Sequence, residues 1–375
     1  MKVNFVLVLN SGSSSVKYSL FKNEKCLSKG IKENIGLQGG EKNHKIAIKK
    51  ILEKLISDKL IKDFSEIKII GHRVVHGEEI FKKAVVLNKK NIKKLKEISY
   101  LAPLHNPANI LGVEICQKLL PKSKNIAVFD TEFYNSLPES AYLYAIPYDF
   151  YQKHKIRKYG FHGISHKYIC QLAEKNIGKK INRLITCHLG AGSSITAIKE
   201  GEPIDTSMGF TPLEGLVMES RSGSIDPSIP LFMISKLGYK ATKVYDILNK
   251  QSGFLGICGL KDFRKILKKE NRKTRLCYEI YLKSVVKHIG SYIALLGGID
   301  AIVFTGGIGE GSAMFRKDVV SYFEFLGAKI DDKKNNQQEK IISTPDSRIK
   351  ILTLPTNEEL MIYREVIKLI NRKQN

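Results

Sequence analysis

The sequence contains one strand–turn–strand pattern twice, and this internal repeat constrains the fold more than any other feature. The apolar run at 6–9 meets the small polar residues NSGSSS at 10–15 before a second apolar run. The stretch LITCHLGAGSSITAIKEG at 184–201 repeats this order. A single turn of this kind is explained equally well by a hairpin, because Asn, Gly and Ser form tight turns. Two such hairpins predict two similar domains, each presenting a small-residue loop toward one cleft.

A third small-residue stretch, GGIGEG at 306–311, follows a β-branched strand. Its glycines let the backbone approach a ligand closely, and the N-terminus of the helix expected after it favours an anion. A dinucleotide fingerprint fails, because G-x-G-x-x-G counted from Gly307 reaches Ser312. A Walker A loop fails too, because no Gly-Lys-Ser/Thr follows a glycine at the required spacing. We therefore interpret the stretch as an anion-binding loop outside these two classes.

The chain alternates strand-like and helix-like segments, which predicts an α/β fold. Its 375 residues suggest about two domains. Strands are predicted at 3–9, 14–22, 67–71, 125–129, 183–188, 193–199, 300–305 and 349–354. Helices are predicted at 43–57, 89–99, 107–119, 165–176, 228–237, 241–250, 274–296, 312–326 and 357–371. The polar stretch 331–340 is predicted to be an exposed loop.

The net charge of +25 raises the question of nucleic-acid binding. The lysines are spread along the chain, and at 88–101 they alternate with Ile92, Leu95 and Ile98 as on a solvated amphipathic helix. Zinc-finger spacing, an RNP motif and an interleaved aromatic stripe are all missing from the sequence. We therefore expect a basic surface that favours anionic substrates, and no nucleic-acid partner.

The sequence also indicates a cytoplasmic protein without membrane segments. The six cysteines form no C-x-x-C pair and suggest no disulfide framework. The opening apolar run is too short for a secretory signal peptide. The longest apolar candidate, 278–298, carries Lys283, Lys287 and His288 and does not have the character of a membrane span.

Several polar residues lie at positions typical of catalytic or metal-binding groups. His72 and His76 are four residues apart, as are His162 and His166. Zinc binding is possible in principle, but neither pair has the Glu of a metalloprotease helix. Asp130 ends a predicted strand, a common place for a catalytic or magnesium-coordinating carboxylate. Taken singly, each of these residues is explained as well by a structural role.

Taken together, the motifs resemble one family over about residues 6–364. In order, they are NSGSSSVKYSLF, GHRVVHG, LAPLHNPAN, VFDTEF, YGFHGISH, HLGAGSSITAI, DTSMGFTPLEGL, RSGSIDP, FTGGIGEG and PTNEEL. This series resembles the acetate kinase family, the acyl-phosphate-forming carboxylate kinases. The resemblance implies a duplicated actin and sugar-kinase ATPase fold, with two domains around a nucleotide cleft. It places the first domain at 1–131 with the C-terminal helix 359–375, and the second at 132–358.

By this resemblance, NSGSSS and HLGAGSS are phosphate loops, and GGIGEG is the adenosine loop. ATP or ADP is the expected nucleotide, and Mg²⁺, with Mn²⁺ as an alternative, is expected at Asn10, Asp130 and Glu358. A homodimer is expected as well. The residues matched to the nucleotide are Lys17, His188, Leu189, Gly190, Ala191, Gly192, Asp262, Phe263, Arg264, Gly307, Ile308, Gly309, Glu310 and Gly311.

The implied reaction is transfer of the ATP γ-phosphoryl group to acetate, giving acetyl phosphate. A carboxylate with a pKa of about 4 is ionised at neutral pH, so no general base is needed. Arg73 and Arg221 would align the carboxylate and phosphoryl oxygens, and His162 would donate to the transferring group. Asp130 would organise the centre. The implied substrate contacts are Arg73, Val75, Leu104, His105, Phe161 and Pro212.

The sequence departs from the family pattern mainly near the nucleotide. Ala191 and Gly311 stand where Asn is usual, and Ser224 stands where Asp is usual. Tyr134 replaces a common His, and the usual Gly-Thr before Arg221 is Glu219-Ser220. Two alternatives remain: a propionate or butyrate kinase, whose members tend to have a smaller residue at the Val75 position, and a nucleotide-binding protein without catalysis.

Overall fold

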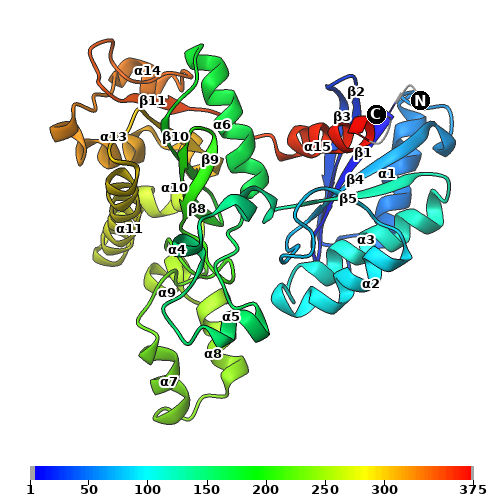
Figure 1. The fold of residues 1–375 in the computed structure, drawn as a ribbon, viewed down its shortest axis with the longest axis horizontal. Helices are drawn as coiled ribbons and strands as arrows, with labels where there is room; N and C mark the ends of the chain where they lie inside the picture. The colour runs from blue at the N-terminus through cyan, green and yellow to red at the C-terminus, as the bar shows by residue number, and fades with distance from the viewer. Residues whose placement is uncertain (1–4, 373–375) are drawn as a thin grey trace. The chain divides into compact units, whose positions relative to one another are not determined.

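The computed structural model describes residues 5–372, which form two compact units (Figure 1). Unit 1 extends to Asn135 and takes up the chain again at Asn357, so that the C-terminal helix belongs to it. Unit 2 comprises Ser136–Thr356. Within residues 5–372, no helix combines the length and the apolar character of a membrane-spanning segment.

Unit 1 is built on a six-stranded sheet of order β3-β2-β1-β4-β6-β5. The first three strands form an antiparallel meander, while β4 and β6 run parallel to β1. The short β5 pairs antiparallel with β6 at the edge. The strands are β1 (Phe5–Ser11), β2 (Val16–Lys22), β3 (Lys25–Lys32), β4 (Ile67–Val74), β5 (Val85–Val86) and β6 (Lys124–Phe129).

Helices of unit 1 bury apolar faces against this sheet. The side chain of Asn43 caps the first helix, α1, by accepting from Ile46 N at 3.0 Å. The last helix, α15, packs so closely on β4 that a methyl group at Gly71 would lie 3.0 Å from Ile362 and Val366. The helices are α1 (His44–Ser57), α2 (Lys89–Glu97), α3 (Asn106–Leu119) and α15 (Glu358–Arg372), with 3₁₀ turns at Phe64–Glu66, Ile98–Leu101 and Glu132–Ser136.

Unit 2 contains a five-stranded sheet of order β11-β10-β7-β8-β9. As in unit 1, an antiparallel meander of three strands is followed by two strands parallel to its first. The shared order confirms the duplicated α/β fold predicted from the sequence. The strands are β7 (Arg183–Leu189), β8 (Ser193–Lys199), β9 (Glu202–Thr206), β10 (Ala301–Thr305) and β11 (Lys350–Thr353).

The helices of unit 2 include the long α11, which Asn271 and Thr274 open with a reciprocal capping box. It ends at Gly297, whose φ of 67° is in the left-handed region. The helices are α4 (Glu139–Tyr142), α5 (Asp149–His154), α6 (Gly163–Ile177), α7 (Ser228–Ser235), α8 (Ala241–Lys250), α9 (Gly253–Cys258), α10 (Phe263–Lys268), α11 (Arg272–Leu296), α12 (Gly306–Gly311), α13 (Ala313–Ser321) and α14 (Asp332–Asn336), with a 3₁₀ turn at Glu324–Leu326.

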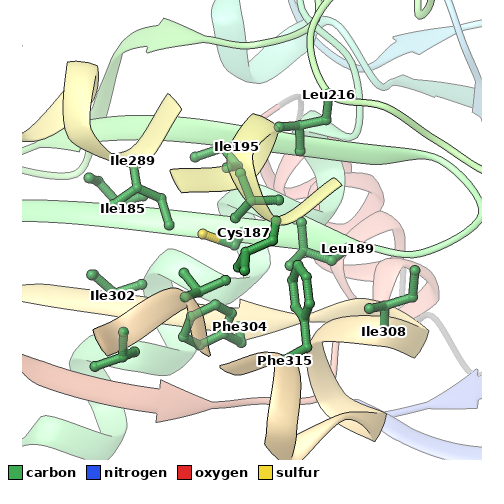
Figure 2. Close-up of a cluster of buried hydrophobic side chains, with 14 of the residues drawn as sticks. Ile185, Cys187, Leu189, Ile195, Leu216, Ile289, Ile302, Phe304, Ile308 and Phe315 are labelled. Carbon is green, nitrogen blue, oxygen red and sulfur yellow. The ribbon is translucent and has the colours of Figure 1, made fainter. Parts of the chain in front are cut away.

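A continuous apolar core lies against the unit 2 sheet (Figure 2). Ile185, Cys187 and Leu189 of β7 alternate toward this core and are fully buried. Ile308 of α12 belongs to the same cluster. The glycine-rich turn is therefore anchored in the core by its one large side chain.

Some local predictions were wrong. The predicted strand 3–9 begins outside the described residues, and the observed strand continues to Ser11. Strands β3 and β9 were missed, because β3 is a lysine-rich edge strand and β9 is short and contains Pro203. The predicted helix 312–326 ends at Ser321, and its last residues form a 3₁₀ turn before Gly327.

The stretch GGIGEG is a short helix rather than a loop. Gly306 adopts a φ of 81°, which turns the chain from β10 into α12. The Glu310 carboxylate closes this turn by accepting from Gly306 N at 2.8 Å and from the Thr305 hydroxyl at 3.2 Å.

The polar stretch 331–340 is not simply an exposed loop either. Asp331 caps α14, accepting from Lys334 N at 3.1 Å. Asn335 is buried, because its side chain binds the fully buried Arg316 with Nε–Oδ1 at 2.8 Å. Arg316 in turn donates to the carbonyls of Gly309 and Glu310 at 2.8 and 2.7 Å. This stretch therefore supports the glycine-rich turn.

Candidate active site

Arg73 and Asp130 form a two-pronged ion pair where β4 and β6 end. Arg73 Nε donates to Oδ1 at 2.9 Å and Nη2 donates to Oδ2 at 2.6 Å. Glu358 Oε2 lies 3.6 Å from Arg73 Nη1. Burial opposes the charged guanidinium, but the Asp130 and Glu358 carboxylates outweigh it and raise the pKa of Arg73. The pair thus holds a permanent cation at the carboxyl edge of the unit 1 sheet.

Two asparagines of the LAPLHNPAN motif fix the chain that leaves β4. Asn109 accepts from Val75 N at 3.1 Å and donates to Ser11 O at 2.7 Å, which links the ends of β4 and β1. Asn106 accepts from His76 N at 3.1 Å and donates to His76 O at 3.0 Å. The sequence analysis missed both residues, although the spacing of polar side chains in an otherwise apolar helix was a usable signal.

The first small-residue loop joins β1 and β2. Gly12 N donates to Ser15 O at 2.8 Å, and His44 Nε2 donates to Gly12 O at 2.7 Å from the start of α1. Asn10 and Lys17 are register partners beside this loop, and Lys17 is exposed. Both predicted residues therefore lie next to the turn of the β1–β2 hairpin.

The predicted acyl-pocket residues divide between the two units. In unit 1, Val75 is buried directly after β4, Leu104 is exposed, and His105 precedes α3. In unit 2, Phe161 is buried and Pro212 is half-buried.

His162 and Arg221 converge on the second small-residue loop in unit 2. A methyl group at Gly192 would lie 3.2 Å from His162 Nε2 and 3.6 Å from Arg221 Nη1. His162 adopts a φ of 57°, unusual for a residue with a side chain, directly before α6. Such strain is typical of positions where a side chain must be aimed.

Further contacts fix these two groups. Arg221 Nη1 donates to Pro212 O at 3.2 Å, and burial lowers the pKa of Arg221. The His162 and His188 rings lie 4.5 Å apart between centroids. Ser165 Oγ is 2.8 Å from His188 Nδ1. The result is an electropositive cluster beside the loop between β7 and β8.

A cavity of about 560 Å³ opens next to this loop. Its walls come from the second small-residue loop, the start of α10 and the α12 turn. Of the residues predicted to bind nucleotide, those that line it are Gly190, Ala191, Asp262, Phe263, Arg264, Gly307, Ile308 and Gly311. Its other lining residues, which the sequence analysis did not assign, are Glu219, Lys261, Leu267 and Ser312.

The other predicted nucleotide residues of unit 2 do not line this cavity. Leu189 and Gly309 are buried, and the Glu310 carboxylate closes the α12 turn. His188 and Gly192 lie on the His162 side of the loop. Phe263 lines the cavity but is largely buried among Phe254, Tyr281 and Phe315, as an aromatic floor.

The departures from the family pattern have local consequences. Ala191 is exposed, and its carbonyl accepts from Glu219 N at 3.3 Å. Burial, with Asp262 nearby, raises the pKa of Glu219. Ser224 Oγ accepts from Gly215 N at 3.0 Å, a role within the loop itself. Tyr134 is buried in unit 1.

The donor set of unit 1 fits a magnesium ion. The described residues hold no cluster of three His, Cys, Asp or Glu side chains arranged around a metal. Asn10, Asp130 and Glu358 offer amide and carboxylate oxygens, and Mg²⁺ is usually held by one or two carboxylates together with water and substrate phosphates. Arg73 contacts both carboxylates, which therefore lie beside the same guanidinium.

The histidine pair at His72 and His76 is structural. His72 is buried and its Nε2 lies 2.8 Å from Asn125 Oδ1. His76 Nδ1 accepts from Glu78 N at 3.0 Å. Burial lowers the pKa of His72 to about 4 and that of His76 to about 3, so both rings are neutral.

Comparison with known proteins agrees with this geometry. The family model for the Acetokinase family matches residues 5–364. A protein from Thermotoga maritima named acetate kinase is 50% identical, with 98% of this chain and 99% of the relative covered. Another from Carboxydothermus hydrogenoformans, also named acetate kinase, is 50% identical, with 98% of this chain and 100% of the relative covered.

Solved structures give the same result. Porphyromonas gingivalis acetate kinase matches with a TM-score of 0.91 at 41% identity, covering 98% of this chain and 100% of its own. A propionate kinase from Francisella tularensis matches with a TM-score of 0.91 at 42% identity, covering 96% of this chain and 98% of its own. With a family match over nearly its whole length, this chain belongs to the acetokinase family.

Proposed function

We propose that the protein is an acetate kinase that reversibly transfers the ATP γ-phosphoryl group to acetate, giving acetyl phosphate and ADP. The observation that carries the proposal is the convergence of His162 Nε2 and Arg221 Nη1 on Gly192, beside a nucleotide-sized cavity. The relatives at 50% identity are named acetate kinase, which supports acetate as the acceptor.

The chemistry requires charge neutralisation rather than proton removal. Acetate is already ionised at neutral pH and is therefore a ready nucleophile. The barrier lies in bringing this anion to the γ-phosphate and in stabilising charge on the phosphoryl oxygens. Cations fixed before the reaction starts act strongly in such a site, because they need no reorganisation.

Each hydrogen-bond donor has a defined part in the proposal. Arg221 and the His162 Nε2–H donate to the equatorial oxygens of the transferring group. Arg73, held by Asp130, aligns the acetate carboxylate through its planar fork. Val75, Leu104, Phe161 and Pro212 surround the acetate methyl group, with His105 beside them.

Asn10, Asp130 and Glu358 would hold Mg²⁺, or Mn²⁺ as an alternative. When bound, the ion neutralises charge on the nucleotide phosphates. The γ-phosphate end of ATP lies by His188 and Gly192, and Lys17 contributes charge from the first loop. The adenosine occupies the cavity between α10 and the α12 turn.

We also propose a cytoplasmic homodimer. Helix α7 has no buried residue and exposes four large apolar side chains, Ile229, Leu231, Phe232 and Ile234. Exposed apolar surface of this kind is typical of a protein–protein contact, and a second copy of the chain would cover it.

A hydroxylamine trap tests the proposed acceptor, because it converts acyl phosphates into hydroxamates. The protein is assayed with ATP and Mg²⁺ against acetate, propionate and butyrate. We expect acetate to give the highest kcat/KM. A higher value for propionate or butyrate would favour the alternative assignment within the family. No hydroxamate from any acid would favour a non-catalytic nucleotide-binding protein.

Replacing Val75 with alanine is expected to shift preference toward propionate. The smaller side chain leaves room for one methylene, which is worth about 1–3 kcal/mol of discrimination. The ratio of kcat/KM for propionate to that for acetate should rise about tenfold. Val74→Ala, a change in the buried core next door, should leave the ratio unchanged. If the Val75 variant also leaves it unchanged, Val75 does not line the acyl pocket.

Replacing Ala191 with asparagine is expected to tighten ATP binding. The added amide can donate to a phosphate, and a hydrogen bond to a charged group is worth about 1.5–3 kcal/mol. The KM for ATP should fall about tenfold, and kcat should change less, because the contact forms in the ground state too. The matched control is Ala241→Asn on the exposed start of α8. An unchanged or higher KM would mean that the loop has adapted to alanine.

A further inference from the structure

A chain of four polar side chains in unit 2 ends at His162. Thr186 Oγ1 lies 2.7 Å from His166 Nδ1. His166 Nε2 lies 2.8 Å from Ser194 Oγ, and the same Ser194 oxygen lies 2.8 Å from His162 Nδ1. Thr186 belongs to β7, Ser194 to β8 and His166 to α6, and His162 directly precedes α6.

The other three members of this chain are buried. Thr186, His166 and Ser194 are fully buried. Burial, together with the nearby His188, lowers the pKa of His166 well below its usual value, so its ring is neutral. Buried polar groups must satisfy one another, which makes the direction of each hydrogen bond in the chain dependent on the next.

Two arrangements of hydrogens satisfy every member of the chain. A third, in which Ser194 accepts from both rings, is disfavoured because its buried hydroxyl contacts those two rings and would have to donate elsewhere. A hydroxyl has one hydrogen, and a neutral imidazole carries one N–H. In the first arrangement, Thr186 donates to His166 Nδ1, His166 Nε2–H donates to Ser194, and Ser194 donates to His162 Nδ1. The only hydrogen of a neutral His162 is then on Nε2. In the second, every bond is reversed and His162 donates from Nδ1.

The groups around His162 distinguish the two hydrogen-bond arrangements. Its Nε2 edge faces Gly192, with Arg221 Nη1 on the same side, while the His188 ring lies 4.5 Å away and His166 shares the Ser194 hydroxyl with His162. The Arg221 guanidinium therefore already places a positive charge on this side of the ring. A neutral ring in the second arrangement would turn a lone pair toward a phosphoryl oxygen, which repels it. The first arrangement places a hydrogen there.

We propose that Thr186, His166 and Ser194 are positioning residues that hold neutral His162 with its hydrogen on Nε2, so that it donates to the transferring phosphoryl group. The inference rests on the proposed function for the role of that donor. It also rests on it for the choice of tautomer, because the phosphoryl oxygen is what disfavours the second arrangement, but the tautomer can be measured whether or not the protein is an acetate kinase.

Nitrogen NMR of the whole chain labelled with ¹⁵N-histidine tests the tautomer directly. The His162 signals are identified by their loss in His162→Gln, and the pH is raised until the ring is neutral. We expect Nε2 to have the chemical shift of a protonated nitrogen and Nδ1 that of an unprotonated one. The reverse pattern, or an even mixture, would overturn the proposal.

Kinetics of Ser194→Ala give a second test that a merely structural role would not pass. Without Ser194, neutral His162 can rotate or change tautomer, and only its cation always carries a hydrogen on Nε2. We expect kcat to fall about tenfold or more at high pH and less at low pH, with KM for ATP within twofold. The wild-type protein should lack this pH dependence.

Thr353→Val is the matched control, because it removes another buried hydroxyl from the same sheet. It should match the wild type in kcat and in pH profile. A loss in Ser194→Ala that is equal at all pH values would assign Ser194 to packing alone and overturn the proposal. If Ser194→Ala does not fold, the wild-type tautomer decides. If the proposed function fails, wild-type protein makes no acetyl phosphate, and the tautomer measurement remains valid.

Discussion

Replacing Arg221 with alanine is expected to lower kcat about 10³-fold or more, with little loss of folded protein. A cationic fork on a transferring phosphoryl group accelerates transfer by about 10³–10⁵. In the structure, Arg221 is half-buried, and its Nη1 contacts Pro212 O and faces Gly192. Its removal takes away charge stabilisation where the reaction needs it, while the backbone that it touches is held by other contacts.

Steady-state kinetics at saturating ATP and acetate measure this effect, with circular dichroism to show that the variant is folded. Arg364→Ala is the matched control, because Arg364 pairs with Glu24 on the surface of unit 1. It should retain activity within twofold. A loss of less than about tenfold in Arg221→Ala would mean that Arg221 does not contact the transferring group.

Replacing Asp130 with asparagine is expected to lower kcat about 10²-fold or more. Asparagine keeps the shape of the side chain but removes the charge that balances Arg73. The guanidinium would keep Glu358, at 3.6 Å, and the charge of Glu359, but would lose the two-pronged carboxylate that fixes its orientation. Removing one preorganised electrostatic group from an active site costs about 10²–10³ in kcat.

Asp300→Asn provides the comparison, because Asp300 pairs with Arg183 at 2.6 Å on unit 2, away from the cavity. It removes the same charge from the same type of pair and should keep kcat within twofold. Equal kcat values for Asp130→Asn and the wild type would show that the buried pair serves only to hold the fold.

Much of the fold could be predicted because the repeat is carried by strong local signals. The apolar runs that contain Val6, Leu9 and their counterparts in β7 end in small polar residues. Short runs bounded in this way are typical of buried strands. Strands β3 and β9 could not be found in this way, since each lies at or near a sheet edge and buries little. Their pairing depends on neighbours that are already in place.

The residues of the site also fall into two groups: those that a local motif indicates, and those whose role depends on contacts distant in the sequence. Arg73, Asp130, His162 and Arg221 were predicted from distinctive motifs, and the structure pairs Arg73 with Asp130 and brings His162 and Arg221 to Gly192. Arg316 was missed, although it is fully buried and holds the α12 turn. The sequence of α13, with one Arg beside one Lys, gives no sign that the Arg will be enclosed and the Lys exposed. That fact depends on Asn335, which lies in a stretch whose composition suggested only solvent exposure.

The Ser194 contacts are also long-range. Ser193 and Ser194 end the stretch HLGAGSS, which the resemblance marks as a phosphate loop, and both lie at the start of β8. The structure instead directs Ser193 to Gly190 O and Tyr281, and Ser194 to two histidines. Because successive side chains of a strand point to opposite faces of the sheet, Ser193 and Ser194 contact different groups. The sequence does not reveal which side chains pack against each face of β8.

Phosphorus NMR of a single reaction measures directly whether this protein transfers the phosphoryl group from ATP to acetate. The protein is mixed with ATP, Mg²⁺ and acetate, and the ³¹P spectrum is followed with time. We expect one acetyl phosphate for each ADP formed by the wild-type protein, and almost no acetyl phosphate with Arg221→Ala. Conversion of ATP to ADP and inorganic phosphate without acetyl phosphate, or no turnover by the wild-type protein, would contradict the proposed function.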